Sequence, residues 1–169
     1  MLNRWVRAAG VVFAGLMLAV GLWSIAPQPV LSQDNQVNYT LSDLKFRDFS
    51  HKNLEGTSLA GAEIRGANFE GANLTATILT KASFVAANLV DANFTQAFAD
   101  RVNFDEADLS NALFVDALLS SSTFNNVKVD GADFSDAILD RYWAKVLCET
   151  AAGTNSTTGV STRDSLGCR

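Results

Sequence analysis

The sequence predicts an all-β solenoid in which the chain bends every five residues and completes one coil every twenty. Three observations support this: an apolar residue at every fifth position, a small residue two places before it, and phenylalanine alternating with a smaller residue. A period of five fits neither an α-helix nor a continuous strand, because either would scatter the apolar side chains around the element. The chain must therefore bend once in every unit.

The five-residue register holds over twenty consecutive positions without a polar residue. These positions are Leu44, Phe49, Leu54, Leu59, Ile64, Phe69, Leu74, Leu79, Phe84, Leu89, Phe94, Ala99, Phe104, Leu109, Phe114, Leu119, Phe124, Val129, Phe134 and Leu139. The residue two places earlier is usually alanine, and Asn or Asp often lies between, as in Ala67-Asn68-Phe69. Each unit thus alternates inward, outward and inward, as a β-strand does, and then turns.

The order of large and small central residues predicts four units in each coil. From Phe84 onward every second central residue is phenylalanine, and the central residues between them are Leu, Ala or Val. With four units per coil, the rings form two columns on opposite sides: Phe84, Phe104 and Phe124, and Phe94, Phe114 and Phe134. Three units per coil would mix large and small residues and leave holes that cost about 1 kcal/mol or more each. Twenty units give five coils, stacked over about 24 Å.

At these residues the sequence resembles the pentapeptide-repeat family, whose units follow the pattern A-[DN]-[LF]-x-x. The resemblance covers residues 42–141 and implies a right-handed quadrilateral β-helix of about five coils. Val37 and Tyr39 fall on the same register. Residues 33–41 are therefore expected to form an N-terminal cap or an extra partial coil.

Residues 1–32 have the pattern of an export signal. Arg4 and Arg7 precede an uncharged run that extends from Ala8 to Ala26, as in a secretory leader. We expect cleavage near Gln33, which leaves eleven basic and eighteen acidic residues and a net charge of −7. The alternative is an uncleaved anchor, because nineteen apolar residues at about 1.5 Å each nearly span a bilayer. In that case the protein would contact the membrane through the leader alone.

Residues 142–169 are predicted to cap the end of the solenoid. Residues 142–148 have the pattern of a short helix, a polar loop follows, and Ser161 is placed to begin a second helix. Cys148 and Cys168 are twenty residues apart, and a disulfide is the usual state of two cysteines in an exported chain. A redox-switched pair is the alternative. The tail also resembles that of exported pentapeptide-repeat proteins of cyanobacteria and plastids, which implies a thylakoid lumen or a periplasm.

Few residues in the sequence carry reactive chemistry. His51 is predicted to lie on an outer corner, without a nucleophile beside it. Two cysteines and one histidine are too few for a zinc site, and the acidic residues around Asp105 and Asp133 lack a calcium-binding loop. We expect no catalytic residue, metal site, cofactor or small-molecule substrate. The net charge of −5 and the isoelectric point near 4.7 argue against nucleic acid as a partner.

One feature is not required by the repeat. On the side of the coil that carries Leu59, the outward residues include four large apolar side chains spaced by twenty: Ile78, Phe98, Leu118 and Ile138. They predict an external stripe about 15 Å long, and exposed apolar patches mark a surface that something covers. The chain's own tail, a second copy or another protein would cover it. The alternatives are that the stripe stays exposed, or that an inward swing of Phe98 removes its exposure.

Two classes of function then remain. The first is an exported, non-enzymatic structural or protein-interaction module, with a protein partner or a homodimer formed through the stripe. The second follows from a resemblance to acidic pentapeptide-repeat proteins that mimic DNA and bind a topoisomerase (gyrase). Eight acidic residues from Asp105 to Asp140 favour the second class. The export signal argues against it, because the topoisomerase is cytoplasmic.

Overall fold

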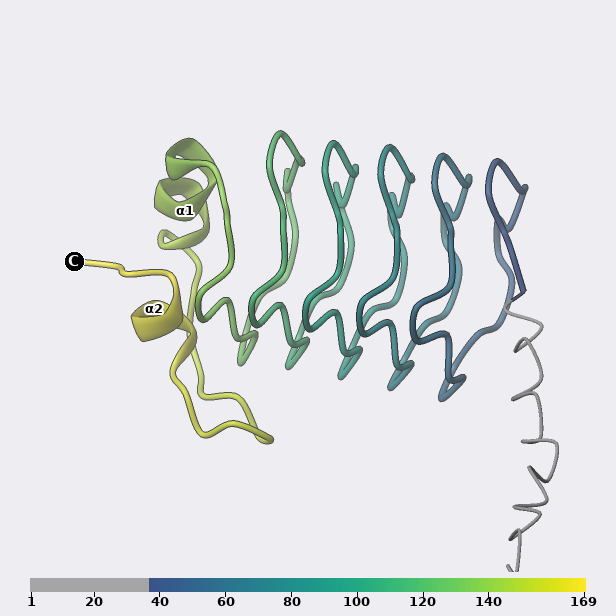
Figure 1. Cartoon of the computed structure of the whole chain (residues 1–169). Helices are drawn as coiled ribbons and strands as arrows, with labels where there is room; N and C mark the ends of the chain where they lie inside the picture. The colour runs from purple at the N-terminus through teal and green to yellow at the C-terminus, as the bar shows by residue number, and fades with distance from the viewer. Residues whose placement is uncertain (1–36) are drawn as a thin grey trace, which may run out of the picture. The chain divides into compact units, whose positions relative to one another are not determined.

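Each five-residue unit forms one side of a four-sided coil, and the coils stack into a rod (Figure 1). The computed structural model describes residues 37–169; the leader and the cleavage site predicted near Gln33 lie outside these residues. We name the sides by their outward residues. Side A begins at Asn38, side B at Asp43, side C at Asp48 and side D at Asn53, and each pairs in parallel with the residue twenty positions later.

The coils are joined by backbone hydrogen bonds and not by long strands. Each side contributes a single bridging residue, so the ladder consists of isolated parallel bridges. Bonds run in both directions along the rod: Tyr39 N–H donates to the Ser58 carbonyl at 2.8 Å, and Glu63 N–H donates to the Ser42 carbonyl at 3.0 Å. Side A recurs from Asn38 to Ile138, which spans five coils. Residues 37–41 therefore add one side to the predicted repeat.

A residue with positive φ forms every corner. Most of these residues are not glycine; Lys81 has φ 63° and Arg101 has φ 56°. Glycine is needed at Gly66, where φ is 64° and an added Cβ would lie 2.7 Å from the ring of Phe46. Corner side chains of one coil thus lie over the corner of the next coil, and the second coil uses glycine to make room for them.

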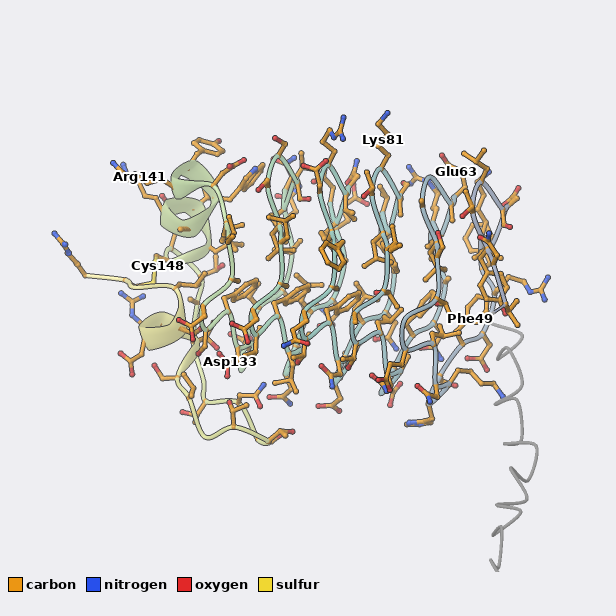
Figure 2. The ribbon with its side chains drawn as sticks, viewed as in Figure 1. Phe49, Glu63, Lys81, Asp133, Arg141 and Cys148 are labelled. Carbon is orange, nitrogen blue, oxygen red and sulfur yellow. A yellow bond between two sulfur atoms is a disulfide. The ribbon has the colours of Figure 1, made fainter. Side chains whose placement is uncertain are left out.

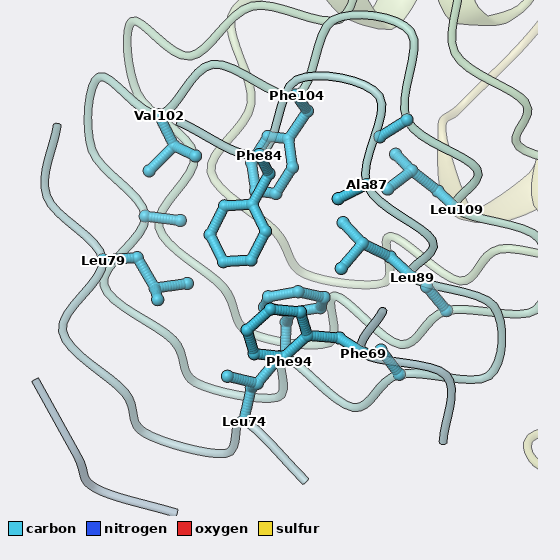
Figure 3. Close-up of a cluster of buried hydrophobic side chains, with 14 of the residues drawn as sticks. Phe69, Leu74, Leu79, Phe84, Ala87, Leu89, Phe94, Val102, Phe104 and Leu109 are labelled. Carbon is cyan, nitrogen blue, oxygen red and sulfur yellow. The ribbon is translucent and has the colours of Figure 1, made fainter. Parts of the chain in front are cut away.

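The two phenylalanine columns predicted from the sequence are confirmed. Phe94 and Phe114 stack with ring centroids 4.8 Å apart, and Phe114 and Phe134 stack at 5.1 Å. Across the coil the columns meet edge to face, with Phe84 and Phe94 at 6.0 Å and 82° (Figure 3). This arrangement of aromatic pairs is a favourable one. The two columns form the axial core, together with leucines on sides A and C and the buried alanines.

Two short helices end the rod. Helix α1 spans Arg141–Leu147 and begins one residue before the predicted start. Its Trp143 packs on Phe124 at 6.0 Å, and Leu147 is buried. Helix α2 spans Thr162–Ser165, and the Ser161 side chain accepts a hydrogen bond from Asp164 N–H, as an N-cap does. A disulfide joins Cys148 and Cys168, whose Cα atoms are 5.6 Å apart.

Asn155 anchors the loop between these helices to the corner between sides C and D. Its amide nitrogen donates to the carbonyls of Asn111 at 3.0 Å and Gly131 at 2.8 Å. Its amide oxygen accepts from Thr157 N–H at 2.9 Å, and Asn155 is almost fully buried. The tail therefore lies along the corner diagonally opposite the one between sides A and B.

The first coil differs from the others at its inward positions. Where later coils have alanine, this coil has Ser42, Arg47 and Lys52, and the two cations are exposed. Tyr39 packs edge to face on Phe49 at 5.6 Å. Charged residues at the last strand of a sheet oppose pairing with another edge. No helix within residues 37–169 is both long and apolar enough to cross a membrane.

Candidate interaction surface

Sides B, C and D carry mainly polar outward side chains, and several of those on sides C and D bond to one another along the rod. On side C, the Asn68 amide donates to Asp48 at 3.1 Å, and the Asn88 amide donates to Asn68 at 2.9 Å. Further along, Lys128 forms an ion pair with Asp108 at 2.9 Å. In these ladders, polar side chains of successive coils bond to one another within the rod.

Side A carries the four apolar residues singled out in the sequence. Ile78, Phe98, Leu118 and Ile138 follow one another through parallel bridges. Ile78 is 45% exposed, Phe98 52% and Ile138 62%, whereas Leu118 is half-buried. We call these four residues the apolar stripe. Removal of such side chains from water is worth about 1.5 kcal/mol or more for each one fully covered.

The structure excludes two of the explanations that the sequence left open. Phe98 does not swing inward, because Ala99 takes the inward position and is fully buried. The tail does not cover the stripe, because Asn155 holds it at the corner between sides C and D. Of the aromatic residues next to Ile138, Trp143 faces the core and Tyr142 is exposed. Within residues 37–169 the stripe thus faces solvent.

Charged columns of opposite sign flank the apolar stripe. We define the basic column as Lys81, Arg101 and Arg141, which follow side A, and the acidic column as Asp116 and Asp136, which precede it. All five side chains are exposed. Lys81 and Arg141 lie along the same edge of the rod, away from Asp133 on side D (Figure 2).

Two further carboxylates lie on the same corner as the basic column, and both are bound within the chain. Asp100 accepts from Arg101 Nε at 2.6 Å. Asp140 accepts from Ser121 N–H at 3.0 Å. On the other edge of the stripe, Leu113 and Val115 are half-buried and extend the apolar surface onto side D.

The histidine and the acidic residues that were considered as reactive or metal-binding groups from the sequence do not come together in the structure. His51 is exposed on a corner with φ 56°, as the sequence predicted for an outer position. Asp105 accepts from Asn125 at 3.0 Å, and Asp108 is engaged by Lys128. No group of three or more His, Cys, Asp or Glu side chains is placed to hold a metal ion in the described part of the chain.

Asp133 links the tail to side D. Its carboxylate accepts from the hydroxyls of Ser135 and Thr158, both at 2.6 Å, and from Ser135 N–H at 2.9 Å. Burial by itself would raise the pKa of Asp133, but these hydrogen bonds hold the pKa below its ordinary value. Asp133 thus stays charged although its side chain is almost fully buried.

An open groove of about 660 Å³ lies beside the disulfide. Its lining includes Arg141, Lys145 and Arg169 together with Cys148 and Cys168. Cations next to a cysteine favour its thiolate form, and thus exchange with another thiol. The redox-switched pair that the sequence left as an alternative stays a prediction.

Sequence reasoning found the apolar stripe but missed the charged columns. Their signal was present: Lys81 and Arg101 are twenty residues apart, as are Asp116 and Asp136. Comparison of corner positions along the repeat would have revealed them. The anchoring residue Asn155 has no such signal, because its partners lie 44 and 24 residues away.

The comparisons agree with this geometry. Models described as pentapeptide repeats (8 copies) and as a pentapeptide repeat region match residues 40–75 and 65–134. A pentapeptide repeat protein of the Arabidopsis thaliana thylakoid lumen is 34% identical, with 75% of this chain and 88% of that chain covered and a TM-score of 0.73. No curated protein matches the sequence.

More distant solved structures include Rfr23 of the cyanobacterium Cyanothece 51142, which is 17% identical over 61% of this chain and 90% of that chain, with a TM-score of 0.37. QnrB1, a plasmid-mediated fluoroquinolone resistance protein, is 17% identical over 66% of this chain and 69% of that chain, with a TM-score of 0.45. The family matches, the identity to the lumenal protein and the twenty-residue bridge register show that this chain belongs to the pentapeptide-repeat family, whose fold is a right-handed β-helix.

Proposed function

We propose that this protein is an exported, non-enzymatic interaction module that contacts a protein through its apolar stripe. The observation that carries the proposal is the exposure of Ile78, Phe98 and Ile138 on one side of a rod whose other sides are mainly polar. The repeat does not require these side chains, because Asn38 and Ser58 occupy the same position in the first two coils. A large exposed apolar patch on a soluble domain marks an interaction site.

Three observations support export to a thylakoid lumen or a periplasm. The leader pattern of residues 1–32 favours it. A disulfide between Cys148 and Cys168 is typical of an oxidising compartment. The pentapeptide repeat protein that is 34% identical comes from a thylakoid lumen. No cofactor or small-molecule substrate is part of this proposal.

Site-specific photo-crosslinking in living cells tests the contact. A photoreactive amino acid replaces Phe98 in one strain and Glu63, an exposed residue on side B, in the control strain. We expect protein adducts from position 98 in the exported fraction and none from position 63. Absence of any adduct at position 98, with the protein present at normal abundance, would overturn the proposal.

A specific observation favours the DNA-mimic function as a second candidate. Residues 91–140 contain ten acidic and two basic residues, whereas residues 37–90 contain five of each. The acid-rich half of the rod would suit a site that binds a duplex. Cell fractionation with N-terminal sequencing separates the candidates. An exported chain that begins near Gln33 supports the interaction module, and a cytoplasmic chain with an intact leader supports the DNA mimic.

A further inference from the structure

We infer that the groove beside the disulfide is a second interaction site, which binds a short acidic segment of another polypeptide. The inference does not depend on the apolar stripe, because the groove lies on the helical cap and is lined by other residues. The groove has a volume of about 660 Å³ and runs between one face of α1 and residues 166–169. The disulfide between Cys148 and Cys168 joins these two walls.

The periodicity of α1 places two cations in the groove. Arg141, Ala144, Lys145 and Cys148 follow one another at intervals of three and four residues, so they share one face of the helix and its C-cap. All four line the groove, and Arg169 lines it from the other wall. Arg141 and Cys148 are both seen at the capped end of the rod (Figure 2). Three cations therefore surround one groove.

These cations have no carboxylate partner of their own. Within residues 37–169, Arg141, Lys145 and Arg169 form no ion pair. None of the described residues that line the groove is acidic. The helix does not account for Arg141, because the helix dipole opposes a cation in the first turn, and α1 has no acidic residue in that turn. The groove thus carries positive charge that a carboxylate ligand would neutralise through charge-assisted hydrogen bonds.

The spacing of the two cations on α1 fits alternate residues of an extended peptide. Arg141 and Lys145 are four residues apart, which is about 6 Å along a helix. Side chains two residues apart in an extended chain point to the same face and are about 6.6 Å apart. A segment with Asp or Glu at alternate positions can therefore reach both cations at once. The guanidinium of Arg141 can bind its carboxylate through two parallel hydrogen bonds.

An apolar hollow adjoins the groove. It has a volume of about 150 Å³, and Ala144 and Leu166 line both the hollow and the groove. Its other walls include Phe134, Ala137 and Leu139 at the last coil. An apolar cavity of about this volume holds a benzene molecule. We therefore expect one branched or aromatic side chain of the acidic segment to occupy the hollow.

The charge of the rest of the molecule selects a short segment rather than an extended polyanion. Residues 141–169 contain four basic and two acidic residues, whereas residues 37–140 contain seven basic and fifteen acidic residues. A nucleic acid or an anionic membrane at the groove would also meet the field of the acidic rod, which repels it. A small molecule needs a site that encloses most of its surface, and the groove is open. A short acidic stretch of a polypeptide can contact the cap alone.

Peptide selection on the full chain, purified after export, tests the charge of the ligand. Random short peptides displayed on phage should be enriched for Asp or Glu at alternate positions with an apolar residue nearby. Arg141→Gln with Lys145→Gln should weaken their binding about tenfold or more in fluorescence anisotropy, the equivalent of one charge-assisted hydrogen bond. Arg65→Gln with Lys81→Gln is the matched control, because it removes the same two kinds of charge from exposed corners of the rod. Selected peptides that are no more acidic than the library, or that bind both double variants equally, overturn the inference.

Two further measurements test the apolar hollow and the class of ligand. Replacement of the apolar peptide residue by alanine should weaken binding to the parent, and it should have little effect on Ala144→Leu, which fills the hollow. A loss of the same size for both proteins, with melting temperatures that show both folded, overturns the role of the hollow. Tighter binding of a DNA duplex or of anionic lipid vesicles than of the peptides, lost in Arg141→Gln with Lys145→Gln, would assign the groove to a polyanion and overturn the inference. Crosslinking at position 98 reports on the apolar stripe alone, so either interaction site can fail without the other.

Discussion

Phe114 shows how much a single central residue contributes. It is fully buried between Phe94 and Phe134, with ring centroids 4.8 and 5.1 Å away. We expect Phe114→Ala to lower the free energy of unfolding by about 3–5 kcal/mol, because it leaves a cavity in a column that cannot collapse. Phe114→Leu should cost less, because it keeps most of the apolar volume. Urea denaturation measures both.

Asn93 is the matched outward position for that experiment. The sequence placed it at the surface, but it is half-buried, and its side-chain oxygen accepts from Thr95 N–H at 2.9 Å. Asn93→Ala should therefore cost about 1 kcal/mol, the worth of one hydrogen bond. If Asn93→Ala and Phe114→Ala lost the same free energy, the inward and outward assignment would be wrong.

Asp133 should give the stability a dependence on acid pH. Because the pKa of its carboxyl is lowered in the folded protein, its contribution is fully present above the unfolded value of about 4. It is lost as the pH falls through the lower folded value. The stability difference between the parent and Asp133→Asn should thus be largest above pH 4 and shrink below it. A difference that does not change with pH would contradict this charge-dependent contact.

At the scale of an element, the corner at Gly66 combines a positive φ with a close neighbour. Gly66→Ala places a Cβ in the left-handed region, at a cost of about 1–2 kcal/mol, and moves it against the Phe46 ring. Gly159→Ala is the control, because its φ is 72° and no atom lies within 4 Å of an added Cβ. We expect the larger loss at Gly66, with Phe46→Ala recovering the excess. Equal losses in thermal unfolding would mean that Phe46 simply moves away.

The disulfide that ties the C-terminal cap should also make a measurable contribution to the free energy of unfolding. A bridge between residues twenty apart should add about 3 kcal/mol by the chain-entropy estimate. Cys148→Ser with Cys168→Ser should lower the stability by about this amount and loosen α1 against α2. A thiol reagent should label no cysteine in the denatured, unreduced parent. One or two labels per chain would contradict the bridge.

For the whole molecule, the two ends of the rod differ in how they oppose stacking. The helical cap covers the last coil, whereas Arg47 and Lys52 are exposed at the first coil, where later coils have alanine. We expect Arg47→Ala with Lys52→Ala to promote end-to-end association, because it removes the charges that protect an edge. Lys45→Ala with Arg65→Ala is the control, since it removes equal charge at corners. Light scattering that rises equally for both pairs would contradict this role.

The repeat register, the four-sided coil and the phenylalanine columns can all be predicted from the sequence alone. Burial of every fifth residue admits only a chain that bends once in each unit, and the alternation from Phe84 to Leu139 fits only an even number of sides. The sequence also shows which four residues form the apolar stripe, because each lies one residue before an inward central position and therefore points outward. These features repeat every five or twenty residues, so each is visible in local pattern.

The placement of the tail, and with it the exposure of the stripe, depends on long-range contacts that the sequence pattern does not reveal. The contacts that hold the tail, from Asn155 to Asn111 and Gly131 and from Thr158 to Asp133, join single residues 24 to 44 positions apart. No repeat relates them, and their hydrogen bonds form only after the last coils are stacked. The sequence therefore left the cover of the stripe open, and the folded tail, bound to the opposite corner, leaves Ile78, Phe98 and Ile138 exposed.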